Sequence, residues 1–184
     1  MSSWGYRAPP TSWATVAEKA WQVRLTAGLD AEPYFPVMPF LERVLDNELG
    51  LVELQIYEDA DCEGAEGLTC LNGTRIVLPQ SVYVGASEGS PRDRFTVAHE
   101  LGHFFLHTQV SLARTPHSGR VRPFENPEVQ ANRFAAELLM PFRLFRDHED
   151  VESVCERFGV SASAATNRLK GWKVETNRAA RRRP

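Results

Sequence analysis

Two histidines and a glutamate form the strongest chemical pattern in the chain. His99, Glu100 and His103 follow the spacing H-E-x-x-H inside an apolar stretch of helical period. Positions i and i+4 lie on one face of a helix, about 6 Å apart along its axis, so both imidazoles can bind one ion. Glu100 then lies beside the ion, where its carboxylate can take a proton from a water that the ion has acidified. The spacing therefore predicts a metal site equipped with a general base.

A catalytic zinc site takes a third protein ligand and keeps one position for water. We expect this ligand to be Glu128, in the first turn of a helix that Asn126 caps and Pro127 begins. Asn132, one turn later on the same face, is predicted to accept the free ring N–H of a ligating histidine and to fix its tautomer. The alternative third ligands are Glu125, Glu137 and His117.

His107 lies one turn beyond the second histidine but is not predicted to be a ligand. No glycine between His103 and His107 turns the chain, so the helix continues and His107 lies about 12 Å from His99 along the axis. One ion cannot bridge that distance. We expect His107 either to line the cleft, as a hydrogen-bond partner of a ligand or of the transition state, or to be an ordinary polar residue near the end of the helix.

The hydrophobic pattern predicts helices on both sides of a small sheet. Apolar residues at helical spacing, with capping residues and glycine or proline stops, predict helices over 12–27, 36–49, 91–108 and 127–140 and an ordered helical unit over 151–172. Strands are expected over 51–56, 68–71 and 74–78, with Asn72-Gly73 as the turn of a hairpin. The fold class is therefore predicted to be α+β, with an antiparallel sheet of about three strands packed with helices.

The predicted domain organisation has three parts. They are a flexible lead-in over 1–10, a single domain over 11–172 that ends in the helical pair 151–172, and a basic tail over 173–184. Within the domain, the stretch 108–126 is either a mobile lid over the cleft or a plain connector. Strand 74–79, if it lies at the edge of the sheet, can hold an extended peptide by backbone pairing.

The composition is that of an ordinary globular protein, with 42% hydrophobic and 24% charged residues in a chain of 184. Apolar runs are only a few residues long, so we expect no transmembrane segment, and no secretory signal precedes the first helix. Cys62, Cys70 and Cys155 form no C-x-x-C pair and are expected to be reduced thiols, with a pairing of Cys62 and Cys70 as the less favoured alternative. A cytoplasmic location is therefore expected.

Charge is unevenly distributed along a chain whose net charge is −3. Residues 30–66 hold eleven acids against one base, Arg43, whereas residues 165–184 hold seven bases against one acid, Glu175. The acidic segment can attract a basic partner, although a solvated face is the favoured interpretation. The basic tail adds at most nonspecific affinity for nucleic acid.

Two segments of the chain resemble one known family. The run His-Glu-Leu-Gly-His at 99–103, with Arg94-Phe95-Thr96 before it and Leu106-His107 after it, resembles the metal motif of the ImmA/IrrE family of metallo-endopeptidases. The run from Glu128 through Ala131-Asn132 to Met140-Pro141 is similar to the downstream block of that family, where the glutamate completes a gluzincin-type zinc site. The resemblance covers roughly residues 12–172 and implies a zincin-like fold with one zinc ion per chain. It also implies His99, His103 and Glu128 as ligands, Glu100 as catalytic base and Asn132 as a supporting residue.

Members of this family cleave helix-turn-helix repressors, so the resemblance implies a zinc-dependent endopeptidase whose substrate is a transcriptional repressor. We expect no room for a fused DNA-binding domain at the N-terminus, which means that the repressor is supplied in trans. The segment 151–168 has a helix, a glycine turn and a second helix, but we expect it to pack or dock a partner rather than to read DNA. Neither direct nucleic-acid binding nor membrane binding is expected, and the sequence leaves the oligomeric state open. The alternative is a metal-containing regulatory or toxin–antitoxin type binding protein with negligible hydrolysis.

Overall fold

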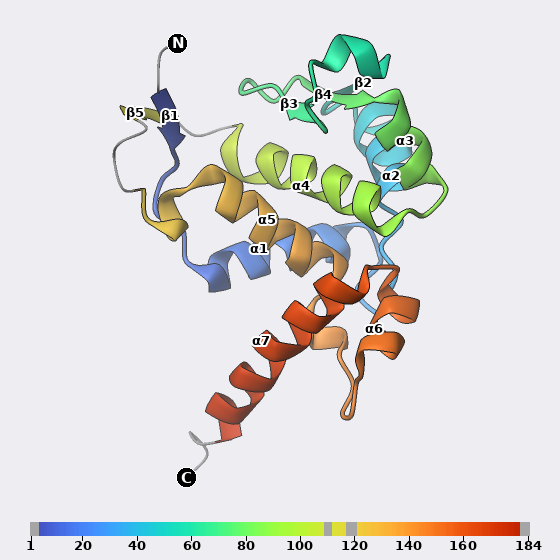
Figure 1. Ribbon diagram of the computed structural model, residues 1–184, viewed down its shortest axis with the longest axis vertical. Helices are drawn as coiled ribbons and strands as arrows, with labels where there is room; N and C mark the ends of the chain where they lie inside the picture. The colour runs from blue at the N-terminus through green and yellow to red at the C-terminus, as the bar shows by residue number, and fades with distance from the viewer. Residues whose placement is uncertain (1–3, 109–111, 117–120, 181–184) are drawn as a thin grey trace.

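The structure is a computed structural model that describes residues 4–108, 112–116 and 121–180 (Figure 1). Helices dominate the chain, and the strands gather in two small sheets. The helices are α1 (Trp13–Thr26), α2 (Val37–Pro39), α3 (Gln80–Ser87), α4 (Pro91–His107), α5 (Pro127–Leu139), α6 (Val151–Phe158) and α7 (Ala162–Ala180). A π-helix over Phe40–Glu48 continues α2, and short 3-10 helices occupy Asp59–Cys62, Pro123–Glu125 and Phe142–Leu144. The strands are β1 (Trp4–Arg7), β2 (Glu53–Tyr57), β3 (Leu68–Thr69), β4 (Arg75–Pro79) and β5 (Ala113–Pro116).

The α+β fold class is confirmed, but the main sheet is mixed rather than antiparallel. Its strand order is β2-β4-β3. β3 and β4 form the predicted antiparallel hairpin, with Thr69 opposite Ile76. β4 runs parallel to β2, with Leu54 opposite Ile76, so the expected antiparallel pairing is wrong for these two strands. The connection between β2 and β3 carries the chain to the far side of β4. The alternation of apolar and polar residues within a strand does not specify which strand lies next to it, so this arrangement could not be predicted from the pattern.

The expectation that strand 74–79 holds a peptide at the sheet edge is wrong. This strand is β4, which is the central strand and already has a hydrogen-bonded neighbour on each side. A central strand has no unpaired backbone groups to offer to another chain. The edge near the histidine motif is β3, because Thr69 on β3 contacts Glu100 on α4.

Helices α4 and α5 form the centre of the molecule and run in opposite directions (Figure 1). Both contribute fully buried apolar residues to the core, among them Val97 and Leu101 on α4 and Phe134 on α5. A glycine at the contact allows a close approach: a Cβ placed on Gly102 would lie 2.9 Å from the Cα and the carbonyl oxygen of Ala131. The two helices therefore lie close enough for side chains on both to meet at one site.

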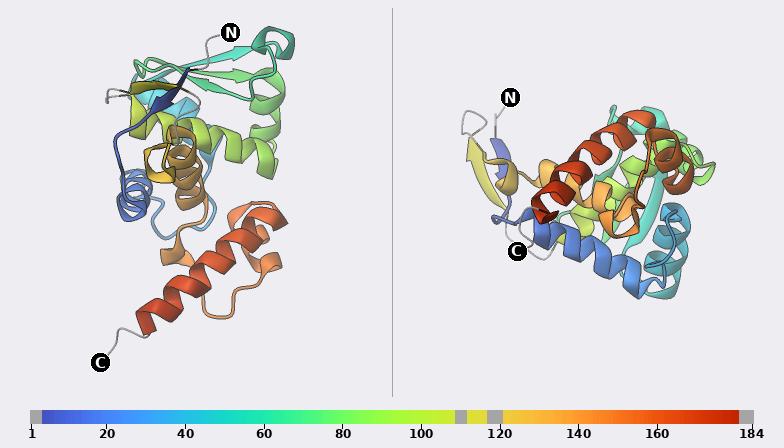
Figure 2. Two further views of the ribbon diagram at one scale, coloured as in Figure 1. Left: turned by 60° about the vertical axis from the view of Figure 1, so that its left-hand side comes forward. Right: turned by 90° about the horizontal axis from the view of Figure 1, so that it is seen from below.

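Near both ends of the described part of the chain, the structure has regular secondary structure. The predicted flexible lead-in over 1–10 contains β1, which pairs antiparallel with β5. The predicted tail begins at 173, but α7 continues to Ala180. The C-terminal half of α7 extends away from the rest of the molecule (Figure 2), while its N-terminal half packs against the core through Ala165 and Leu169. No helix among the described residues combines the length and hydropathy needed to cross a membrane.

Candidate metal centre

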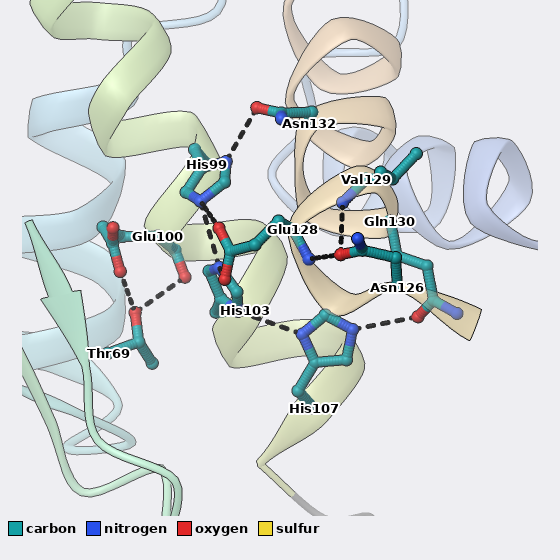
Figure 3. A network of polar contacts seen from close by, with 10 residues as sticks. All are labelled: Thr69, His99, Glu100, His103, His107, Asn126, Glu128, Val129, Gln130 and Asn132. Carbon is teal, nitrogen blue, oxygen red and sulfur yellow. Dashed lines mark hydrogen bonds and ion pairs between the residues drawn. The ribbon is translucent and has the colours of Figure 1, made fainter. Parts of the chain in front are cut away.

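Three side chains from two helices meet at one point (Figure 3). His99 and His103 lie on successive turns of α4, and Glu128 lies in the first turn of α5. The Nε2 atoms of the two histidines are 3.0 Å apart. Glu128 Oε2 lies 3.2 Å from Nε2 of His99, and Glu128 Oε1 lies 3.5 Å from Nε2 of His103. The structure thus brings together the three residues that the sequence predicts to be ligands.

These distances fit the donor set of a zinc ion. Zinc–nitrogen and zinc–oxygen bonds of about 2.0–2.1 Å in a tetrahedral site place neighbouring donors about 3.3 Å apart. The three observed separations, which involve a different oxygen of Glu128 for each histidine, bracket that value. Two imidazole nitrogens and one carboxylate oxygen are also the ligand set of one class of catalytic zinc site. Among the described residues, no further His, Cys, Asp or Glu joins the group.

The local sequence explains how Glu128 reaches the centre. Asn126 is the N-cap of α5, and its side-chain oxygen accepts hydrogen bonds from the backbone N–H of Glu128 at 2.9 Å and of Val129 at 3.4 Å. Pro127 occupies the first helical position, as predicted. The carboxylate of Glu128 remains 65% exposed at the helix start, so it can face both the histidines and the open cleft.

Asn132 holds His99 as the sequence predicts. Its Oδ1 lies 2.9 Å from Nδ1 of His99, so the imidazole presents Nε2 to the other ligands. Burial by itself lowers the pKa of His99, but contacts with Glu128, Glu100 and Asn132 outweigh burial and raise the pKa. Hydrogen bonds from His103 and then His99 hold the pKa of Glu128 far below its usual value. The carboxylate is therefore ionised and available to a cation.

A chain of hydrogen bonds supports His103. Its Nδ1 lies 3.1 Å from Nδ1 of His107, and Nε2 of His107 lies 2.9 Å from Oε1 of Gln130. Gln130 in turn donates to the carbonyl groups of Pro9 and Phe124, which fixes its oxygen toward His107. Burial lowers the pKa of His107 to about 4, so the imidazole is neutral and can accept the N–H of His103. His107 thus contacts the predicted ligand His103, in line with one of the two expectations, and does not join the group of three.

Glu100 lies beside the three ligands on the side of the sheet. Its side chain is buried, with 6% of the residue exposed. The hydroxyl of Thr69 donates to Glu100 Oε2 at 2.7 Å and also lies 3.0 Å from the backbone oxygen of Glu100. A Cβ on Gly67 would lie 2.9 Å from both Cγ and Oε1 of Glu100. Strand β3 and the residue before it thus fix the orientation of the carboxylate.

The alternative third ligands do not join the group in the described part of the chain. Glu125 pairs with Arg7, and Glu137 pairs with the buried Arg168. His117 lies outside the described residues. Part of the predicted lid or connector over 108–126 also lies outside them, so the choice between those two interpretations stays open.

Three residues that shape the site were not predicted from the sequence. Thr69 and Gly67 lie in a segment with no metal-binding pattern of its own, and Gln130 lies between two predicted site residues on α5. Of the three, Gln130 alone could have been found from its position, one turn before Phe134 on the inner face of α5. An amide that is buried there needs hydrogen-bond partners.

The metal group lies in a cleft of about 620 Å³. Its lining includes Thr69, Glu100, Asn132 and the three ligands, with Tyr6, Leu71, Phe95 and Leu112 as apolar walls. A cleft of this size accepts several residues of a peptide. The arrangement has a cation site, an adjacent carboxylate base and an open apolar cleft, which are the parts of a metal-dependent hydrolase.

Two histidines and a glutamate beside a buried carboxylate, in an open cleft, are the arrangement expected of a metallopeptidase. The model of the IrrE N-terminal-like domain, a peptidase family, matches residues 62–170, which is more than half of the chain. The chain therefore belongs to this family, and the resemblance described above is confirmed. Comparison with curated proteins and with solved structures found no match.

Proposed function

We propose that the protein is a zinc-dependent endopeptidase that binds one zinc ion through His99, His103 and Glu128. The observation that carries the proposal is the set of three donor separations, 3.0, 3.2 and 3.5 Å, next to a fixed carboxylate in an open cleft. A structural zinc site uses four protein ligands, whereas a catalytic site uses three and keeps one position open. The described residues supply three.

Glu100 is the proposed catalytic base. Zinc bound at this site would act as a Lewis acid on the scissile carbonyl and would acidify water. Glu100 accepts the proton of the attacking water and returns it to the leaving amine. The hydroxyl of Thr69 holds one carboxylate oxygen, so the other oxygen keeps a fixed direction during both transfers. Asn132 and His107 keep the two imidazoles in the tautomer that presents Nε2 to the ion.

We place the substrate as an extended segment along β3. This strand lines the cleft through Leu68 and Thr69, and among the described residues only β4 pairs with it. Its outer side can pair with a peptide backbone, while the exposed Leu68 offers an apolar contact. Such pairing brings a peptide carbonyl to the three ligands without requiring a particular side chain at the scissile bond.

We further propose that the substrate is a helix-turn-helix transcriptional repressor supplied in trans and cleaved at a specific site. Family membership supports this step. The proposed location is the cytoplasm, which is supported by the free thiols of Cys62, Cys70 and Cys155.

Metal content and hydrolysis test the proposal separately. The zinc-reconstituted parent should hold one equivalent of zinc, and His99→Ala and Glu128→Ala should lose it. Glu152→Ala is the matched control for Glu128→Ala, because Glu152 is an exposed glutamate in the first turn of α6, and this variant should keep the metal. Glu100→Gln should keep zinc and lose hydrolysis of a random peptide library. A parent that binds zinc but cleaves no peptide would instead favour the metal-containing binding protein.

A further inference from the structure

A second cavity of about 730 Å³ adjoins the metal cleft. The two cavities share three lining residues, Glu66, Phe95 and Thr96. From this shared rim the second cavity extends between the N-terminal half of α4, the C-terminal half of α5 and the N-terminal half of α7. It is therefore the continuation of the metal cleft toward the C-terminal helical pair, and its volume lies in the range of ligand sites.

The floor of this cavity is apolar. Side chains from α4, α5, α7, the 3-10 helix after α5 and the connections next to these helices contribute to it, namely Phe95, Ala136, Met140, Phe142, Val160 and Ala164. Met140 and Val160 are almost completely buried, and Ala136 and Ala164 are only partly covered. Both alanines are small and line the same cavity, whose volume has room for a large side chain.

The charged residues at the rim of this cavity are paired within the protein. Arg92 pairs with Glu66, while Arg133 and Arg168 share the carboxylate of Glu137. Arg168 also interacts with the charge of Glu175, so three carboxylates lie near the three guanidinium groups. The rim therefore carries no excess charge, and the apolar floor is what distinguishes the cavity.

We infer that this cavity is a substrate subsite that binds a large apolar side chain. The inference rests on the proposed endopeptidase function and names the specificity of the same site. Phe95 precedes His99 by one turn, about 6 Å along α4, and Arg92 precedes it by about 10 Å. An extended peptide advances about 3.3 Å per residue, so the bound side chain lies two to three residues from the scissile bond.

Continuity with the metal cleft identifies the occupant as the substrate chain. A peptide that lies along β3 and across the three ligands reaches the shared rim at Phe95 and Thr96 without leaving the cleft. A separate small ligand would not require that connection. Backbone pairing at β3 does not select side chains. A pocket two to three residues from the scissile bond would supply the selectivity that this pairing lacks.

Peptide selection tests the inference without depending on hydrolysis. Zinc-loaded Glu100→Gln protein is used to select binders from a displayed library of random peptides. The same selection is repeated after adding Ala164→Phe, which fills the cavity from α7, or Ser163→Phe, which obstructs its exposed rim. Ala162→Phe is the matched control, because Ala162 is exposed on the same helix but does not line the cavity. Zinc content and sedimentation are measured for every variant.

The expected result is enrichment of a large apolar residue at one position in peptides selected by the parent and by the Ala162→Phe control. Filling the cavity should lower the affinity for these peptides by about tenfold or more, since a buried apolar side chain contributes that much. Two results would overturn the inference. One is that the same peptides are selected before and after the cavity is filled, and the other is a dimer of the parent that only the filled variants disrupt. Wild-type protein that binds the selected peptides but does not cleave them would refute the proposed function and leave the subsite standing.

Discussion

Replacing Gly102 with alanine tests how α4 and α5 build the metal centre. The new Cβ would lie 2.9 Å from Cα and the carbonyl oxygen of Ala131 and 3.2 Å from its Cβ. Two of these three atoms are backbone atoms of α5, so no side-chain rotation relieves the contact. Carbon atoms in contact prefer about 3.5–4.0 Å, so the helices must separate locally by about 0.5–1 Å.

Distances between a metal ion and its ligands vary by only about 0.2 Å, so a displacement of this size exceeds what a metal site tolerates. Glu128 precedes Ala131 by three residues on α5 and moves with it, whereas His99 and His103 stay on α4. We therefore expect Gly102→Ala to lower zinc affinity at least tenfold. Overpacking should also lower the free energy of unfolding of the metal-free protein by about 1–3 kcal/mol, partly offset by the higher helix propensity of alanine.

Zinc affinity is measured by competition with a chromophoric chelator, and stability is measured by urea unfolding of the metal-free proteins. Gly171→Ala provides the matched control, because Gly171 also lies inside a helix but its added Cβ would meet only Cζ of Phe142, at 3.4 Å. This control should keep zinc affinity and gain up to about 1 kcal/mol of stability. If Gly102→Ala matched the parent in both measurements, the close approach at Ala131 would not be what positions the ligands.

Three further predictions concern the residues around the ligands. Thr69→Val removes the hydroxyl that holds the Glu100 carboxylate, so kcat on a selected peptide should fall about tenfold or more while zinc content stays at one equivalent. Gln130→Leu leaves His107 without its acceptor and should weaken zinc affinity about 10- to 100-fold in the same chelator competition; unchanged affinity would contradict the supporting chain. Free zinc at 100 times its Kd should stabilise the parent by about 2.7 kcal/mol over the chelated protein in thermal melts, and His99→Ala should show no such difference.

The elements that carry the ligands could be predicted because their signals are local. The periodic pattern and its boundary residues predict helices over 91–108 and 127–140, and the structure has α4 and α5 over Pro91–His107 and Pro127–Leu139. The spacing of two histidines on one helix and the Asn-Pro-Glu start of the other fix where the donors lie on each element. The hairpin at Asn72-Gly73 is local in the same sense.

The features that the sequence did not predict depend on contacts between distant segments. The parallel pairing of β2 with β4 joins strands separated by the β3 segment, and nothing in either strand specifies that neighbour. Helix α3, over Gln80–Ser87, was not predicted, because its short apolar pattern directly follows a strand. The role of Thr69 depends on the edge position of β3, and the role of Gly102 depends on the approach of α5.

The helices that hold the ligands also fix the walls of the second cavity. Arg94 on α4 donates to backbone carbonyl groups at the turn between α6 and α7, and Arg168 on α7 pairs with Glu137 on α5. Both guanidinium groups are buried, so losing either set of contacts would leave a buried charge without its partner, at a high cost in stability. These buried contacts of Arg94 and Arg168 therefore fix the position of α7 relative to α4 and α5. A change in the distance between α4 and α5 must then alter the shape of the cavity as well as the ligand geometry. For this reason we expect Gly102→Ala to change both the zinc affinity of the protein and the set of peptides that it selects.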